Sequence, residues 1–188
     1  MIFQLFKYLE ENNIRFAVTN GYKDIVSKRD TEADIDILIR KYDFKNVEDI
    51  LQNFCVQHDL KLVQVLHHDL WAKNIFLFNP KTMRFLNLDL YAELSRKGII
   101  FFEEGEVFNS LDEFEGIPII SAEKEFISYL YKKIEKNDLT QENFIHLNYL
   151  YQKEALCEKQ LKNIFPANYH FIVEAFTKNN IDTILLHR

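Results

Sequence analysis

The stretch Ala33–Ile39, with the sequence ADIDILI, combines an apolar strand with two carboxylates. Side chains alternate between the two faces of a β-strand, so Asp34 and Asp36 share one face while the isoleucines point to the other. Aspartate is a poor strand former, and two carboxylates on one face repel each other. Either a bound divalent cation or exposure to solvent must compensate this repulsion.

A second strand carries the same kind of pattern. In Leu86–Tyr91, LNLDLY, the leucines share one face, and Asn87, Asp89 and Tyr91 share the other. If the two strands are neighbours in a sheet, Asp89 joins the two earlier aspartates in a cluster of three carboxylates. Mg²⁺ prefers oxygen ligands and keeps water positions that substrate phosphates can take. We therefore expect the three aspartates to converge around a metal site.

A turn precedes the first of these strands. The short β-prone run Arg15–Thr19 ends in Asn20-Gly21, and a polar stretch with several cations follows. Glycine at this place lets the backbone approach a phosphate closely, although Asn-Gly is also an ordinary turn sequence. The candidate nucleotide-binding residues are Asn20, Gly21, Tyr22, Lys23 and Arg29.

The order of these features resembles the nucleotidyltransferase superfamily related to DNA polymerase β. That pattern is a strand, a glycine (Gly21), a spacer, an apolar-flanked Asp-x-Asp at Asp34 and Asp36, and a third carboxylate on a later strand, here Asp89. Tyr22 stands where the family usually has Gly or Ser. Within the superfamily, the chain is most similar to small bacterial nucleotidyltransferase-like proteins.

The resemblance implies a small mixed sheet with helices packed on it, two Mg²⁺ or Mn²⁺ ions, and a nucleoside triphosphate such as ATP as substrate. A nucleoside monophosphate would pass from it to a hydroxyl acceptor. It also implies roles: Asp34 and Asp36 bridge both ions, and Asp89 holds the metal on the acceptor side and takes the proton. Two other functions remain open. A glycosyltransferase also uses Asp-x-Asp, but only 33 residues precede Asp34. A non-catalytic, antitoxin-like binding or regulatory module would bind a helical protein partner or a second copy of the chain.

The chain order predicts an α/β (α+β) protein in three parts. Residues 1–94 form the nucleotidyltransferase-like domain with a mixed β-sheet and helices. Residues 95–120, which hold three of the four glycines, form a linker with short extended pieces. Residues 121–188 form a helical C-terminal region, in which Asp138 and Gln141 have capping-box spacing at the start of a helix.

Composition narrows the class of protein. The 188 residues are 47% hydrophobic, which excludes disorder, and the net charge of −6 argues against general nucleic-acid binding. Two cysteines, Cys55 and Cys157, do not make a disulfide scaffold and suit a reducing compartment. No apolar run reaches the length of a membrane span, and no secretion signal is apparent. We therefore expect a soluble cytoplasmic protein, with Cys55 on the buried face of a helix.

Overall fold

The computed structural model describes residues 1–28, 34–153 and 158–187. The chain forms two compact units: the first comprises Met1–Leu94 and Glu103–Ile120, and the second comprises Ser95–Phe102 and Ser121–Arg188. The protein has a mixed α/β fold with a seven-stranded mixed sheet and a C-terminal helical region, which confirms the predicted fold class.

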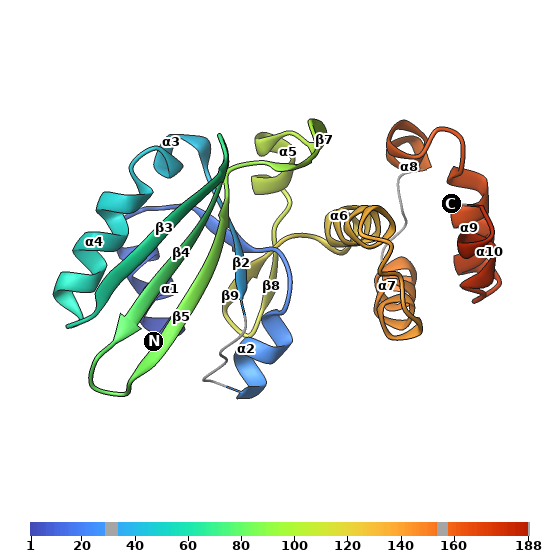
Figure 1. The fold of residues 1–188 in the computed structure, drawn as a ribbon. Helices are drawn as coiled ribbons and strands as arrows, with labels where there is room; N and C mark the ends of the chain where they lie inside the picture. The colour runs from blue at the N-terminus through green and yellow to red at the C-terminus, as the bar shows by residue number, and fades with distance from the viewer. Residues whose placement is uncertain (29–33, 154–157, 188) are drawn as a thin grey trace. The chain divides into compact units, whose positions relative to one another are not determined.

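The first unit holds the seven-stranded sheet and its covering helices (Figure 1). Its elements in chain order are α1 (Ile2–Glu11), β1 (Phe16–Val18), α2 (Tyr22–Lys28), β2 (Ile35–Ile39), α3 (Lys41–Phe44), α4 (Val47–Gln57), β3 (Lys61–Asp69), β4 (Ala72–Asn79), β5 (Arg84–Tyr91), α5 (Glu104–Phe108), β8 (Asp112–Phe114) and β9 (Ile117–Ile119).

The strand order of the sheet is β3-β4-β5-β2-β1-β9-β8. β1 runs antiparallel to β2, β2 runs parallel to β5, and β4 pairs antiparallel with β5. The parallel pairing therefore places β2 and β5 side by side at the centre of the sheet, although 44 residues separate Ile39 from Arg84.

Helices α1 and α4 pack on one face of this sheet (Figure 1). The apolar side chains of α1 recur at helical spacing, and those of β2 and β5 alternate, so all three elements turn one apolar face to the same core. Cys55 of α4 lies in that core, and burial raises the pKa of its thiol to about 11. The predicted core position of this cysteine is confirmed.

The expected linker over residues 95–120 takes a different form. Residues 95–102 belong to the second unit, whereas residues 103–120 belong to the first and contribute α5, β8 and β9. β9 pairs in parallel with β1 and β8 pairs with β9, so this segment supplies one edge of the main sheet. Each strand is only three residues long, and its stability depends on pairing that a local pattern does not reveal.

The second unit contains a small sheet and five helices within the described residues. Its elements are β6 (Leu94–Arg96), β7 (Ile99–Phe102), α6 (Ala122–Glu135), α7 (Gln141–Lys153), α8 (Glu158–Ile164), α9 (Tyr169–Thr177) and α10 (Asp182–Leu185).

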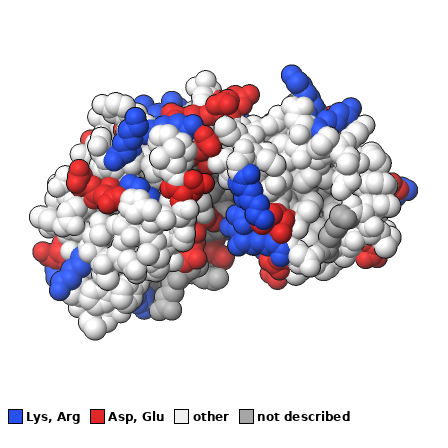
Figure 2. All heavy atoms as spheres, turned by 45° about the horizontal axis from the view of Figure 1, so that its top comes forward, with Lys and Arg blue, Asp and Glu red and all other residues white. Residues whose placement is uncertain are grey.

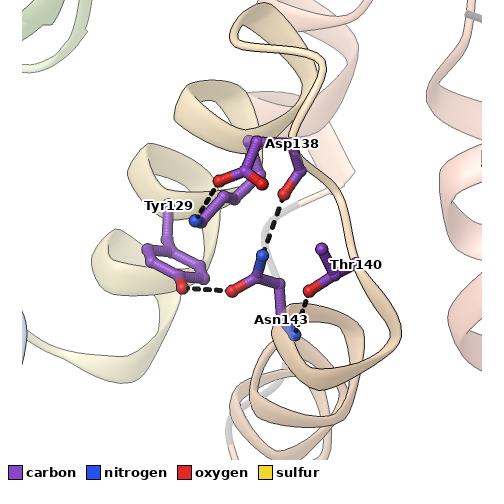
Figure 3. A network of polar contacts seen from close by, with 5 residues as sticks. Tyr129, Asp138, Thr140 and Asn143 are labelled. Atoms are coloured by element: carbon purple, nitrogen blue, oxygen red, sulfur yellow. Dashed lines mark hydrogen bonds and ion pairs between the residues drawn. The ribbon is translucent and has the colours of Figure 1, made fainter.

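A polar network fixes the turn between α6 and α7 (Figure 3). Asn143 accepts a hydrogen bond from the Tyr129 hydroxyl at 2.7 Å and donates one to the Asp138 carbonyl at 2.8 Å. Its backbone N–H is 3.3 Å from Thr140 Oγ1, and Lys133 Nζ lies 2.7 Å from Asp138 Oδ2. Thr140 therefore caps α7, and the predicted cap at Asp138 is wrong because that carboxylate pairs with a lysine instead.

The surface charges are mixed. In Figure 2, acidic and basic side chains are interspersed on the face shown. Several form ion pairs within the first unit, such as Lys41 with Glu93 and Lys73 with Glu48, each at 2.6 Å. None of the helices in the described part of the chain has the length and apolar composition that a bilayer crossing requires.

Candidate active site

Asp36 and Asp89 lie directly opposite each other on neighbouring strands. They are register partners in the parallel pairing of β2 with β5, and both side chains stand on the face away from the buried isoleucines and leucines. Like charges directly opposite in a sheet are destabilising, so neighbouring groups must compensate them. The structure thus brings together two of the three predicted carboxylates.

Tyr91 supplies part of that compensation. Its hydroxyl donates a hydrogen bond to Asp36 Oδ1 at 2.9 Å and lies 3.4 Å from Asp89 Oδ2. Burial, reinforced by the negative charges of Asp36 and Asp89, raises the pKa of Tyr91 far above its usual value. The phenol is therefore neutral at physiological pH and acts as a shared donor to the two carboxylates.

Two asparagine side chains donate hydrogen bonds to the aspartates. The side-chain amide of Asn74, on β4, donates to Asp89 Oδ1, and that of Asn87, on β5, donates to Asp34 Oδ1. Asp34 immediately precedes β2 and is exposed. The third predicted carboxylate is thus tied to β5 at the position two residues before Asp89.

The glycine turn follows a residue that is hydrogen-bonded to the backbone of Asp36. Thr19 follows β1, and its backbone N–H donates to the Asp36 carbonyl at 3.0 Å. Gly21 has a φ of +74°, a left-handed conformation that favours glycine, and a Cβ placed there would meet no described residue beyond its chain neighbours within 4 Å. Among the described residues, the space next to the Gly21 Cα is therefore open.

The other predicted binding residues have different surroundings. Tyr22 is 4% exposed, and its ring packs against Phe114 with centroids 5.1 Å apart, so its side chain belongs to the core. Lys23 is exposed at the start of α2. Arg29 lies outside the described residues.

The oxygen atoms of the site are of the type that binds a hard divalent cation. Carboxylate and amide oxygens are the ligands that Mg²⁺ and Ca²⁺ prefer. The buried Oδ1 of Asn87 has no hydrogen-bond partner among the described residues, so a cation or a donor would satisfy it. Within that same part of the chain, no three His, Cys, Asp or Glu side chains form a group that could hold a metal. The fit thus rests on Asp36, Asp89 and the Asn87 amide oxygen, while Asp34 accepts a hydrogen bond from the same Asn87 side chain.

Asn74 is a site residue that the sequence analysis does not predict. It is 7% exposed and lies opposite Asp89 in the pairing of β4 with β5. Its signal in the sequence is a lone amide among apolar residues in KNIFLF. The role of this amide can be recognised only when the strand register is known, because the register places it beside a carboxylate.

Comparison of the chain with protein-family models, with curated proteins and with solved structures gives no match. The function of the chain must therefore be inferred from the site itself.

The compensating role of Tyr91 predicts a measurable loss of stability. In a chelator, Tyr91→Phe should lower the free energy of unfolding by about 1–2 kcal/mol, since both carboxylates lose a donor while the ring remains. Urea unfolding followed by circular dichroism measures this change. Tyr42→Phe, at a position 78% exposed, is the matched control. Equal stability of both variants would show that the hydroxyl does not compensate the carboxylates.

Proposed function

We propose that this protein is a metal-dependent nucleotidyltransferase that transfers a nucleoside monophosphate from a nucleoside triphosphate to a hydroxyl acceptor. The observation that carries the proposal is the direct pairing of Asp36 with Asp89 on adjacent parallel strands, beside the open turn at Gly21. Stabilising contacts hold these like charges together, which is typical of a functional site.

Asp36, Asp89 and the amide oxygen of Asn87 are the groups that would hold Mg²⁺ or Mn²⁺. A bound divalent cation lowers the pKa of a coordinated hydroxyl and neutralises charge on transferring phosphates. The chain itself fixes the two carboxylates at one register position of the sheet. They are therefore already oriented before the reaction, and little reorganisation of the site is needed.

The turn at Asn20 and Gly21 is the proposed phosphate contact. It directly follows Thr19, whose N–H donates to the Asp36 backbone carbonyl, and a Cβ placed on Gly21 would meet no other described part of the chain within 4 Å. Tyr22 takes the place of the family's small residue and packs its ring in the core. The backbone and Lys23 would therefore bind phosphate in place of a small hydroxyl side chain.

The proton of the acceptor hydroxyl passes to Asp89 in this proposal. The acceptor oxygen attacks the α-phosphorus, the bond to the pyrophosphate oxygen breaks, and pyrophosphate leaves with its electron pair. Tyr91 cannot act as the base, because its raised pKa keeps it protonated. Its hydrogen bond instead orients the carboxylates of Asp36 and Asp89.

The test is transfer of label from α-labelled nucleoside triphosphates. Purified protein is incubated with Mg²⁺ or Mn²⁺ and with fractionated cellular metabolites and macromolecules as acceptors. We expect label on one acceptor fraction together with release of pyrophosphate. A protein that binds no triphosphate in the presence of either metal and transfers no label would contradict the proposal and favour a binding module.

The phosphate contact predicts a selective effect at Gly21. Gly21→Asn should weaken binding of a triphosphate about tenfold or more, since a side chain would enter the space next to the turn, whereas asparagine tolerates a positive φ. Isothermal titration with a non-hydrolysable triphosphate and Mg²⁺ measures the affinity.

Gly116→Asn is the matched control for this variant. Gly116 lies between β8 and β9 and has a φ of +82°, and a Cβ placed on it would likewise meet no described residue beyond its chain neighbours within 4 Å. The control should cost similar stability and leave affinity unchanged. If both variants bind the triphosphate alike, the turn at Gly21 has no phosphate role.

A further inference from the structure

β3 is an exposed edge of the seven-stranded sheet. It is nine residues long and pairs with β4 alone among the described strands. Seven of its nine residues are exposed. An edge strand presents unpaired backbone N–H and C=O groups, and a long one invites pairing with another strand.

Two apolar side chains of β3 are exposed at this edge. Val63 is 55% exposed and Leu66 is 38% exposed. Leu62 and Val65 lie on the other face and pack against the core at its margin. An added strand would therefore bury apolar surface on both faces of the sheet.

Each half of β3 contains one bulge. The pairing with β4 skips one residue between Leu62 and Gln64 and another between His67 and Asp69. Seven residues of β3 keep a partner on β4, and Val65 is the middle one, with three before it and three after it. An antiparallel copy of β3 centred on Val65 sets a half with one bulge against a half with one bulge, so the two strands have equal lengths on either side of the axis.

The charges of β3 are also self-complementary. Lys61 begins the strand and Asp69 ends it. Their partners on β4 are Phe78 and Ala72, which stand on one face of that strand, so the two charged side chains share a face as well. In an antiparallel pair centred on Val65, Lys61 of each copy lies opposite Asp69 of the other.

We propose that β3 pairs with the β3 of a second copy of this chain, antiparallel and about a two-fold axis at Val65. The two sheets then form one continuous sheet, and two Lys61–Asp69 pairs fix its register. Such an isologous contact closes on itself and yields a dimer and not a fibre. The inference is independent of the proposed catalytic activity.

Reversal of charge tests the proposed pairing. Sedimentation equilibrium should show a dimer for the parent, and Lys61→Asp should raise its dissociation constant about tenfold or more at low salt. Asp69→Lys should do the same. The double variant Lys61→Asp/Asp69→Lys should return to within about threefold of the parent, because each pair is restored with its sign reversed.

Lys45→Asp is the matched control. Lys45 is exposed between α3 and α4, and the variant changes the net charge equally. A parent chain that stays monomeric up to about 1 mM, the weak end of specific association, overturns the proposal. So does a dimer that Lys61→Asp and Lys45→Asp weaken alike, or one that the double variant does not restore.

A cross-link tests the register without relying on charge. Opposite residues in an antiparallel pair have Cα atoms about 4.5–5.5 Å apart, which suits a disulfide. In a Cys157→Ser background, Val65→Cys should form an intermolecular disulfide under mild oxidation. Leu62→Cys should not, because the two Leu62 residues lie in opposite halves of the paired strands. Cross-linking of Leu62→Cys in place of Val65→Cys would overturn the proposed axis.

Discussion

Asp36→Asn is expected to lower label transfer roughly a thousandfold, equivalent to about 4 kcal/mol of activation free energy. The change removes the charge of one carboxylate but keeps an oxygen that can accept the Tyr91 hydrogen bond, now 2.9 Å long. The new amide group can donate to Asp89 across the strand pair. The fold should therefore survive while the site loses the charge that a divalent cation needs.

Thermal unfolding separates this effect from misfolding. In a chelator, Asp36→Asn should be as stable as the parent or more stable, because a like-charge repulsion disappears. A cation at a hundredfold excess over its Kd should stabilise the parent by about 2.7 kcal/mol and the variant hardly at all.

Asp59→Asn is the control, since Asp59 is exposed and its φ of +55° suits asparagine. This variant should keep both the metal response and the activity. Strong destabilisation of Asp36→Asn in chelator would instead make Asp36 a structural hydrogen-bond acceptor. Unchanged label transfer would remove it from catalysis.

Phe126→Ala is expected to destabilise the second unit by about 3–5 kcal/mol. Phe126 is fully buried on α6, and its ring lies 5.0 Å from that of Phe176 and 5.8 Å from that of Tyr151, measured between centroids. Truncation would leave a cavity among aromatic rings that cannot collapse without moving α7 and α9. Urea unfolding followed by the helical circular dichroism signal measures the loss.

Ile145→Ala is the control for this prediction. Ile145 lies on α7 and is 63% exposed, so its truncation should change the free energy of unfolding by less than about 0.5 kcal/mol. A similar loss for the two variants would mean that the aromatic cluster is not the core of this unit.

The sequence is informative about the carboxylates because alternation along a strand is a local property. ADIDILI and LNLDLY each place aspartate opposite the apolar face, and the structure has both strands with that alternation. Their pairing is not local. The sequence predicts it only on the condition that the strands are neighbours, and the register that sets Asp36 against Asp89 comes from the structure.

The elements that escape prediction are short or depend on distant partners. Residues 22–28 have the composition of a polar stretch, yet they form α2 because Tyr22 and Ile25 reach the core on one side. β8 and β9 form only against β1. The amide of Asn74 has no recognisable role until β4 and β5 are in register. In each case the deciding interaction joins residues far apart in the chain.

The division of residues 95–120 between the two units has a consequence for how this protein can change over evolution. The polypeptide passes from one unit to the other after Leu94, again after Phe102 and again after Ile120. A single recombination point therefore cannot exchange the helical part for another: a cut at 94 removes β8 and β9 from the sheet, and a cut at 120 leaves β7 behind. Exchange of the helical part with the sheet left intact would require crossovers at all three of these points.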